Sequence, residues 1–151
     1  MPHTLGIIET STGGCISSAI TSIPGISRHF LESSVLYNQE SKERLLRGRL
    51  DGESSVSPQT AFRLAKAFRK QSNADFVLAE TGMAGPPDAS RHSTKNGQCC
   101  LALVSEAEEL ERVLALSPFF TKNQHQLLFA LEAVKWLIET LAIADRREGS
   151  L

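Results

Sequence analysis

The residues Thr4–Ser22 read TLGIIETSTGGCISSAITS, and the rest of the chain is organised around them. The apolar run Leu5–Ile8 predicts a buried strand, and Gly14–Ser22 predicts a short helix after a polar glycine turn. Such a turn can bind an anion, because converging N–H groups and the positive end of the helix dipole face it. The same residues also suit a well-capped helix without a ligand, since Ser, Thr and Gly are favoured at N-caps.

The composition limits the classes of protein to which the chain can belong. The 151 residues suffice for one domain with its own core, and 16 basic against 17 acidic residues give no support to binding of nucleic acid or a membrane surface. Cys15, Cys99 and Cys100 fit neither a disulfide framework nor a zinc site, so we interpret them as thiols buried in a reducing compartment. No apolar run approaches the ~20 residues of a membrane span. With no signal-peptide pattern, the sequence predicts a soluble, cytoplasmic protein.

The remaining chain alternates between strand and helix patterns. Strands are expected at Ser34–Tyr37, Phe76–Ala79, Cys99–Val104 and Glu109–Ser117, and helices at Gln39–Arg47, from Ser57-Pro58 to near Asn73, and at Lys122–Ala144. Surface loops are expected at Gly48–Val56 and, as a mobile segment, at Asp88–Asn96. This alternation predicts a single α/β domain, a three-layer α/β/α sandwich with a mixed, largely parallel sheet.

The last helix carries the longest amphipathic pattern of the chain. Its buried stripe is expected to consist of Leu127, Leu131, Val134, Ile138 and Leu141. Trp136 lies off this stripe and is expected to face solvent or a partner.

Two of the predicted strands end in glycine-rich turns, ETSTGG at Glu9–Gly14 and ETGMAGPP at Glu80–Pro87. Ligands of open α/β sheets bind where the carboxyl ends of strands meet. We therefore expect both turns to line one pocket.

These turns and the residues between them resemble the CinA C-terminal domain family, the nicotinamide mononucleotide deamidases. ETSTGG corresponds to the family's ESCTGG, Tyr37–Lys42 (YNQESK) to a YSNEAK-like run, and Thr81–Pro86 (TGMAGP) to TGIAGP. Further matches in the same order are Thr21, Pro24, Gly25, Ser27 and Phe30. The resemblance covers nearly the whole chain. We expect residues 1–151 to form one domain that lacks the family's leading helix and the second domain of longer members.

The resemblance implies a metal-independent amidohydrolase, with no cofactor, that converts nicotinamide mononucleotide into nicotinate mononucleotide and ammonia. It implies a small-molecule nucleotide substrate and a homo-oligomer. A hydroxyl nucleophile, Thr10 or alternatively Ser11, would be activated by Lys42, with Tyr37 assisting. A lysine serves as a base only where burial or a neighbouring cation lowers its pKa.

The implied substrate contacts come from both turns. In the first turn, N–H groups would stabilise an oxyanion or hold the phosphate; the second turn would form the facing wall. The residues concerned are Glu9, Thr12, Gly13, Gly14, Thr81, Gly82, Ala84 and Gly85.

The chain departs from the family pattern at two functional positions. Thr10 stands where the family has serine, and its extra methyl restricts χ1 and crowds the line of attack. Ser11 keeps a primary hydroxyl but, one residue further along an extended segment, points the other way. Thr121–Asn123 replaces a glycine-acid-arginine run, which is expected to remove a substrate-binding cation.

Other interpretations of these residues remain open at this stage. A degenerate, non-catalytic relative that binds a nucleotide or a protein partner is the alternative function. Without the family pattern, Lys42 suits a solvated helix face, Tyr37 a half-buried strand and Thr81 the closing of a turn.

Overall fold

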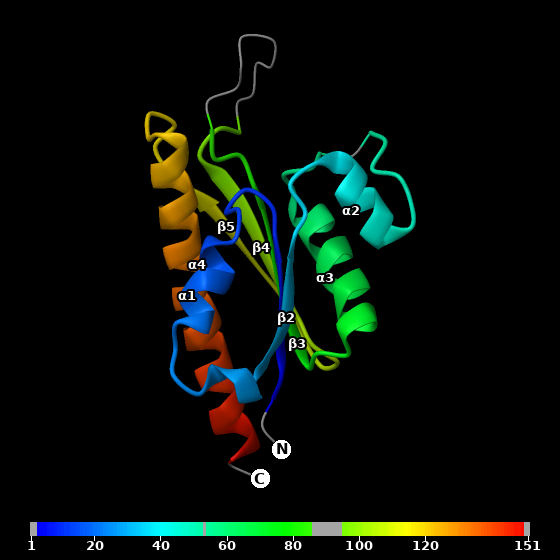
Figure 1. Cartoon of the computed structure of the whole chain (residues 1–151), viewed down its shortest axis with the longest axis vertical. Coiled ribbons are helices and arrows are strands. Elements are labelled where there is room, and N and C mark those ends of the chain that lie inside the picture. Colours follow the sequence, from blue (N-terminus) through cyan, green and yellow to red (C-terminus); the bar gives the residue numbers. More distant parts are fainter. Residues whose placement is uncertain (1–2, 53, 86–94, 150–151) are drawn as a thin grey trace.

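A five-stranded sheet forms the centre of the computed structural model, which describes residues 3–52, 54–85 and 95–149. Its strands are β1 (Leu5–Glu9), β2 (Phe30–Val35), β3 (Phe76–Gly82), β4 (Gln98–Val104) and β5 (Glu109–Ala115). The helices are α1 (Cys15–Thr21), the 3-10 turn η1 (Ile26–Arg28), α2 (Gln39–Leu46), α3 (Pro58–Ser72) and α4 (Lys122–Glu148). Helices α1 and α4 cover one face of the sheet and α2 and α3 the other (Figure 1). The predicted three-layer α/β/α sandwich is confirmed.

The sheet has the order β2-β1-β3-β4-β5 and is mixed, as predicted. Strand β1 pairs in parallel with β2 and β3, whereas β4 pairs antiparallel with β3 and with β5. The β1–β3 register runs from Leu5 opposite Phe76 to Ile8 opposite Ala79. One step further, the register brings Glu9 and Glu80 side by side. Both glycine-rich turns therefore start at the same edge of the sheet.

Apolar side chains pack on both faces of the two central strands, β1 and β3. Alternate residues of β1 and β3 pack under α1 and α4 or under α3, so Ile7 and Leu78 belong to one core and Ile8 and Ala79 to the other. The continuous apolar runs in the sequence predicted these strands for this reason.

Strand β2 begins earlier than expected, at Phe30 instead of Ser34, and ends at Val35 instead of Tyr37. The predicted bounds were wrong because β2 is an edge strand and carries little apolar pattern. Leu31, Glu32 and Val35 are exposed, and the other residues of the strand are only partly buried.

Helix α3 starts and ends where its capping residues predict. The Ser57 hydroxyl accepts a hydrogen bond from the N–H of Thr60 at 3.1 Å, and Asn73 ends the helix in the left-handed conformation with φ of 57°. The preceding stretch was expected to be a surface loop, but Leu50 and Val56 are buried there. Of the expected mobile segment Asp88–Asn96, residues 88–94 lie outside the described residues.

The buried face of α4 differs from the predicted stripe. Phe129, Ala133 and Leu137 are at most 1% exposed, whereas Leu127, Leu131 and Ile138 are 54–55% exposed. The prediction selected bulky residues, but small alanines let the helix approach the core. Of the other predicted members, Val134 and Leu141 are partly buried, and so is Trp136, which packs against the core instead of facing solvent. Among the described helices, none is both long and apolar enough to cross a membrane.

Leu131→Gln tests the corrected face of α4. The exchange is expected to change the free energy of unfolding by no more than about 0.5 kcal/mol, because Leu131 is exposed and both residues favour helices. Urea unfolding followed by circular dichroism measures the change. A loss above about 2 kcal/mol, as expected of a core leucine, would contradict this placement.

Candidate functional site

Glu9, the last residue of β1, is fully buried and caps α1 from inside the protein. Its carboxylate accepts hydrogen bonds from the N–H groups of Gly14 at 3.1 Å and of Ile16 and Ser17 at 2.9 Å. The hydroxyls of Thr12 and Ser17 donate to it as well, at 2.7 and 2.5 Å. The anion at the positive end of α1 is therefore the carboxylate of Glu9, which belongs to the protein itself.

Glu80 of β3 is the second fully buried carboxylate, and it fastens the first turn to β3. It accepts from the N–H groups of Thr10 at 2.9 Å and Thr12 at 3.2 Å and from the Ser11 hydroxyl. The Thr12 hydroxyl, which has one proton, lies between the two carboxylates, 2.8 Å from Glu80 and 2.7 Å from Glu9. The N–H groups of Thr12 and Gly14, expected to face substrate, thus donate to internal carboxylates.

Lys42 of α2 is buried, with 7% of its surface exposed. Burial lowers the pKa of its ammonium, while the nearby charge of Glu80 opposes the shift by a smaller amount. Among the described residues, none forms a hydrogen bond or ion pair with this ammonium. A solvated lysine is excluded by this burial, and a lysine that loses its proton more readily can act as a base.

The two candidate hydroxyls differ in their surroundings. Ser11 donates to Glu80, whereas no described residue forms a hydrogen bond with the Thr10 hydroxyl. Thr10 directly follows β1, which ends at Glu9, and its side chain is buried, with 3% of its surface exposed. The Ser11 hydroxyl is thus held by Glu80, and this favours Thr10 over Ser11 as the hydroxyl that a base could activate.

Tyr37 and Lys122 meet at the outer side of the site. The ammonium of Lys122, the first residue of α4, donates to the Tyr37 hydroxyl at 2.5 Å and lies 5.2 Å from the centre of its ring. The Lys122 side chain also passes within 3.4 Å of where a Cβ of Gly85 would lie. The Thr121–Asn123 segment thus places a cation beside Tyr37, while the expected loss of the family's substrate-binding cation stays a prediction. Tyr37 itself is 56% exposed.

The two turns pack directly against each other, and the expectation that they line one pocket stays a prediction. A Cβ on Gly82 would lie only 2.7 Å from the Ser11 hydroxyl oxygen, so this position requires glycine. Thr81 is buried, and its hydroxyl donates to the carbonyl of Ser55.

Helix α4 holds both turns through residues that the sequence analysis did not assign. A ring nitrogen of buried His125 lies 2.5 Å from the carbonyl oxygen of Ala84, and the Gln126 amide donates to the carbonyl of Ser11 at 3.0 Å. A capping box between Thr121 and Gln124 fixes the start of this helix. The Thr-x-x-Gln pattern at Thr121–Gln124 is the feature of the sequence that could have predicted where this helix begins.

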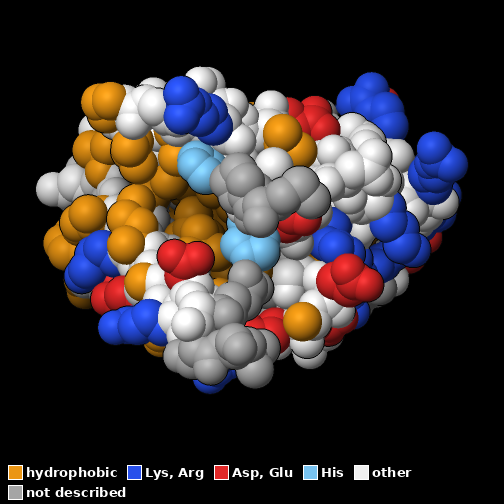
Figure 2. All heavy atoms as spheres, turned by 90° about the horizontal axis from the view of Figure 1, so that it is seen from below, with side chains coloured by type: hydrophobic (Ala, Val, Ile, Leu, Met, Phe, Trp, Pro, Cys, Tyr) orange, Lys and Arg blue, Asp and Glu red, His pale blue; other side chains and the backbone are white. Residues whose placement is uncertain are grey.

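The apolar hollow in Figure 2 lies away from the glycine-rich turns. Its volume is about 550 Å³, and it is bordered by His3, His29 and the last turns of α4. It reaches Leu5 and Phe76, which begin β1 and β3, so it lies at the opposite end of the strands from the glycine-rich turns. Within the described ranges, no three His, Cys, Asp or Glu side chains are placed to hold a metal ion.

The family model described as CinA C-terminal domain matches residues 2–141. The chain belongs to the CinA C-terminal domain family. Two CinA-like relatives, from Chlorobium phaeobacteroides and Geotalea daltonii, are 31% identical over 144 residues and 34% identical over 137 residues. These alignments cover 91% and 89% of this chain but only 34% and 32% of the relatives. The chain thus spans about a third of the length of these CinA-like proteins.

Solved structures of the family share this fold. A competence or damage-inducible protein of Enterobacter asburiae is 25% identical and superimposes with a TM-score of 0.82 over 92% of this chain and 87% of its own. A competence/damage-inducible protein of Agrobacterium tumefaciens, 28% identical, gives 0.80 over 91% and 84%. The family resemblance seen in the CinA-type motifs is confirmed.

Proposed function

We propose that this CinA-type domain is a nicotinamide-nucleotide amidohydrolase with Thr10 as nucleophile and Lys42 as base. One observation carries the proposal: Lys42 is a buried lysine with a lowered pKa and no ion-pair partner among the described residues. A buried ammonium without a counter-charge destabilises a fold, and such lysines are characteristic of sites that use the neutral amine.

In the proposed reaction, Lys42 accepts the hydroxyl proton as the Thr10 oxygen attacks the carboxamide carbon. The tetrahedral intermediate then collapses, the C–N bond breaks, and Lys42 returns the proton to the departing ammonia. Water hydrolyses the resulting ester, which releases the carboxylate and restores Thr10. Because Thr12 and Gly14 donate to carboxylates, we assign the oxyanion to the N–H of Gly13.

The cation at the outer side of the site suits the phosphate of a mononucleotide. Lys122 holds its ammonium at the Tyr37 hydroxyl and beside Gly85. An ammonium and a phenol can both donate to phosphate oxygens. We therefore propose that Lys122 and Tyr37 bind the substrate's phosphate, with Thr81–Gly85 as the facing wall.

Ammonia release from nicotinamide mononucleotide tests the activity. The purified chain is expected to release ammonia above the level of a Lys42→Ala variant at equal concentration. Equal release by both proteins would refute the catalytic proposal.

Thr10→Ser isolates the effect of the extra methyl. The variant is expected to release ammonia about tenfold faster, roughly 1.4 kcal/mol of barrier, because serine attacks without the γ-methyl. Initial rates at saturating substrate measure the change. A variant slower than wild type would show that the methyl positions the hydroxyl instead of obstructing it.

The threonine at position 10, where the family has serine, also supports a second candidate function. In this alternative the domain binds a pyridine nucleotide without turning it over. Calorimetric binding of nicotinamide mononucleotide, combined with no ammonia release by the wild type or by Thr10→Ser, would support this candidate over the first.

Self-association remains a proposal as well, carried by the exposed Leu127, Leu131 and Ile138. A monomeric mass in light scattering at micromolar concentration would count against it.

A further inference from the structure

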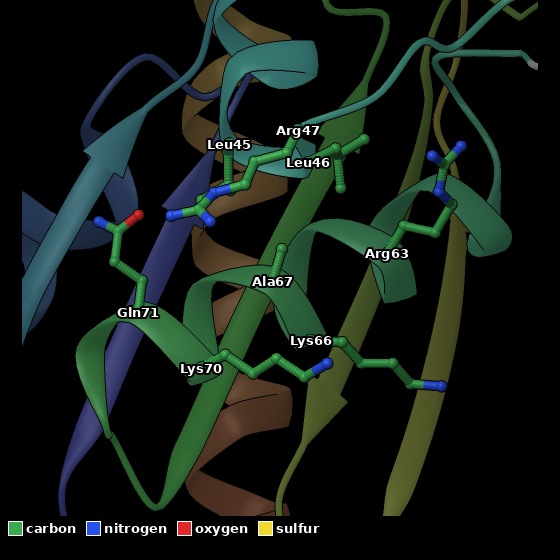
Figure 3. A pocket seen from close by; sticks show the side chains of 8 residues that line it. All are labelled: Leu45, Leu46, Arg47, Arg63, Lys66, Ala67, Lys70 and Gln71. Carbon is green, nitrogen blue, oxygen red and sulfur yellow. The ribbon is translucent and has the colours of Figure 1, made fainter.

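A groove of about 560 Å³ runs between α2 and α3, away from the glycine-rich turns. Four cations line it: Arg47 at the end of α2, and Arg63, Lys66 and Lys70 along α3. Figure 3 shows Arg47 extending from α2 over the groove, with Ala67 and the α3 cations on the other side. Its volume is typical of sites for small molecules.

The charge of this groove is not balanced by its own lining. Among the described residues, no acid lines it, and α3 contains no Asp or Glu over Pro58–Ser72, although the whole chain has a net charge of −1. Lys66 pairs with Glu109 of β5 at 2.8 Å. For Arg47 and Lys70, the described part of the chain supplies no ion-pair partner. The groove therefore concentrates positive charge that an anion would neutralise.

Arg47 occupies an unusual backbone conformation for its residue type. It ends α2 in the left-handed region with φ of 51°, where glycine or asparagine is favoured, although Gly48 follows directly. A strained cation at the rim of a basic groove points to a use for its side chain.

We propose that this groove binds a small molecule bearing a diphosphate group. The guanidinium of Arg47 donates in pairs to phosphate oxygens, Lys70 supplies a second charge across the groove, and the organic part of the ligand lies on Leu45 and Ala67. None of these residues belongs to the proposed hydroxyl–lysine site, so the inference does not depend on the amidohydrolase activity.

Calorimetry with inorganic pyrophosphate, at constant ionic strength, tests the groove. The double variant Arg47→Asn/Lys70→Gln removes both charges, and asparagine suits the left-handed conformation at residue 47. Binding is expected to weaken at least about tenfold in this variant. It is expected to stay unchanged in Arg112→Gln, which removes an exposed cation of β5, and in Lys42→Ala.

Five results would overturn the proposal. The first is no pyrophosphate binding by the wild type, and the second is equal affinity in the double variant. The third is equal binding of sulfate at the same ionic strength, which would indicate a diffuse counter-ion effect. The fourth is tighter, competitive binding of a single-stranded oligonucleotide. Loss of binding in Lys42→Ala alone would assign pyrophosphate to the catalytic site, and that too refutes a separate groove site, whereas failure of the amidohydrolase assay leaves all these outcomes unchanged.

Discussion

Glu80→Ala is expected to lower the free energy of unfolding by about 3–5 kcal/mol. The exchange leaves the N–H groups of Thr10 and Thr12 and the hydroxyl of Ser11 without their common acceptor, whereas the Thr12 hydroxyl keeps Glu9 as an acceptor. Each buried donor left unpaired costs about 1–3 kcal/mol, and removing a buried charge offsets part of the sum. Urea unfolding followed by circular dichroism measures the difference.

Two variants separate this role from a general effect of losing an acid. Glu106→Ala removes an exposed carboxylate after β4 and is expected to change stability by less than about 0.5 kcal/mol. Glu80→Gln keeps one oxygen acceptor and is expected to fall between Glu106→Ala and Glu80→Ala. A loss below about 1 kcal/mol in Glu80→Ala would show that the first turn does not depend on this carboxylate.

The parts of the fold that the sequence predicted are those where one physical effect dominates. Burial on both faces produced the apolar runs of β1 and β3, and the capping residues Ser57 and Asn73 marked the ends of α3. The edge strand β2 has neither signal. The face of α4 was misplaced because Ala130 and Ala133, which are small, form part of the packed surface.

At the candidate site, too, the sequence predicted some features and not others. The turn motifs predicted that residues far apart in sequence would meet, and Gly82 against Ser11 bears this out. The motifs did not predict that Glu9 and Glu80 would fill the N–H groups of the first turn, because acids, hydroxyls and glycines serve capping and ligand binding equally. The position of Lys122 was not predicted because the family pattern has an arginine after an acid there, whereas this chain has a lysine as the first residue of α4.

Two carboxylates held inside the turns, and one lysine held without a described partner, give the site a distinct electrostatic character. Glu9 and Glu80 each bind donors of the first turn, so their charges are largely satisfied by the backbone and hydroxyl groups around them. Lys42 has only the more distant influence of Glu80, which opposes the effect of burial without cancelling it. The turn is thus stabilised by its acids, while the lysine remains available for chemistry.

Lys42→Ala is expected to reduce the rate of ammonia release by about 10²–10⁴-fold, the usual contribution of a positioned base. In the proposed mechanism the neutral amine is the active form, so the rate is expected to rise with pH and to level off above the pKa of Lys42. Burial lowers that pKa, which places the rising limb below the pH of an ordinary lysine.

Glu80→Gln tests the role of Lys42 through the pH at which the rate rises, because the charge of Glu80 raises the pKa of Lys42. Removing that charge is expected to move the rising limb further toward low pH, whereas Lys122→Ala, at the proposed phosphate site, should raise KM and leave the limb in place. Initial rates from pH 6 to pH 10, measured well below the unfolding temperature of each variant, report both quantities. A limb that stays fixed in Glu80→Gln, or a Lys42→Ala variant that retains wild-type rates, would remove Lys42 from the proposed reaction.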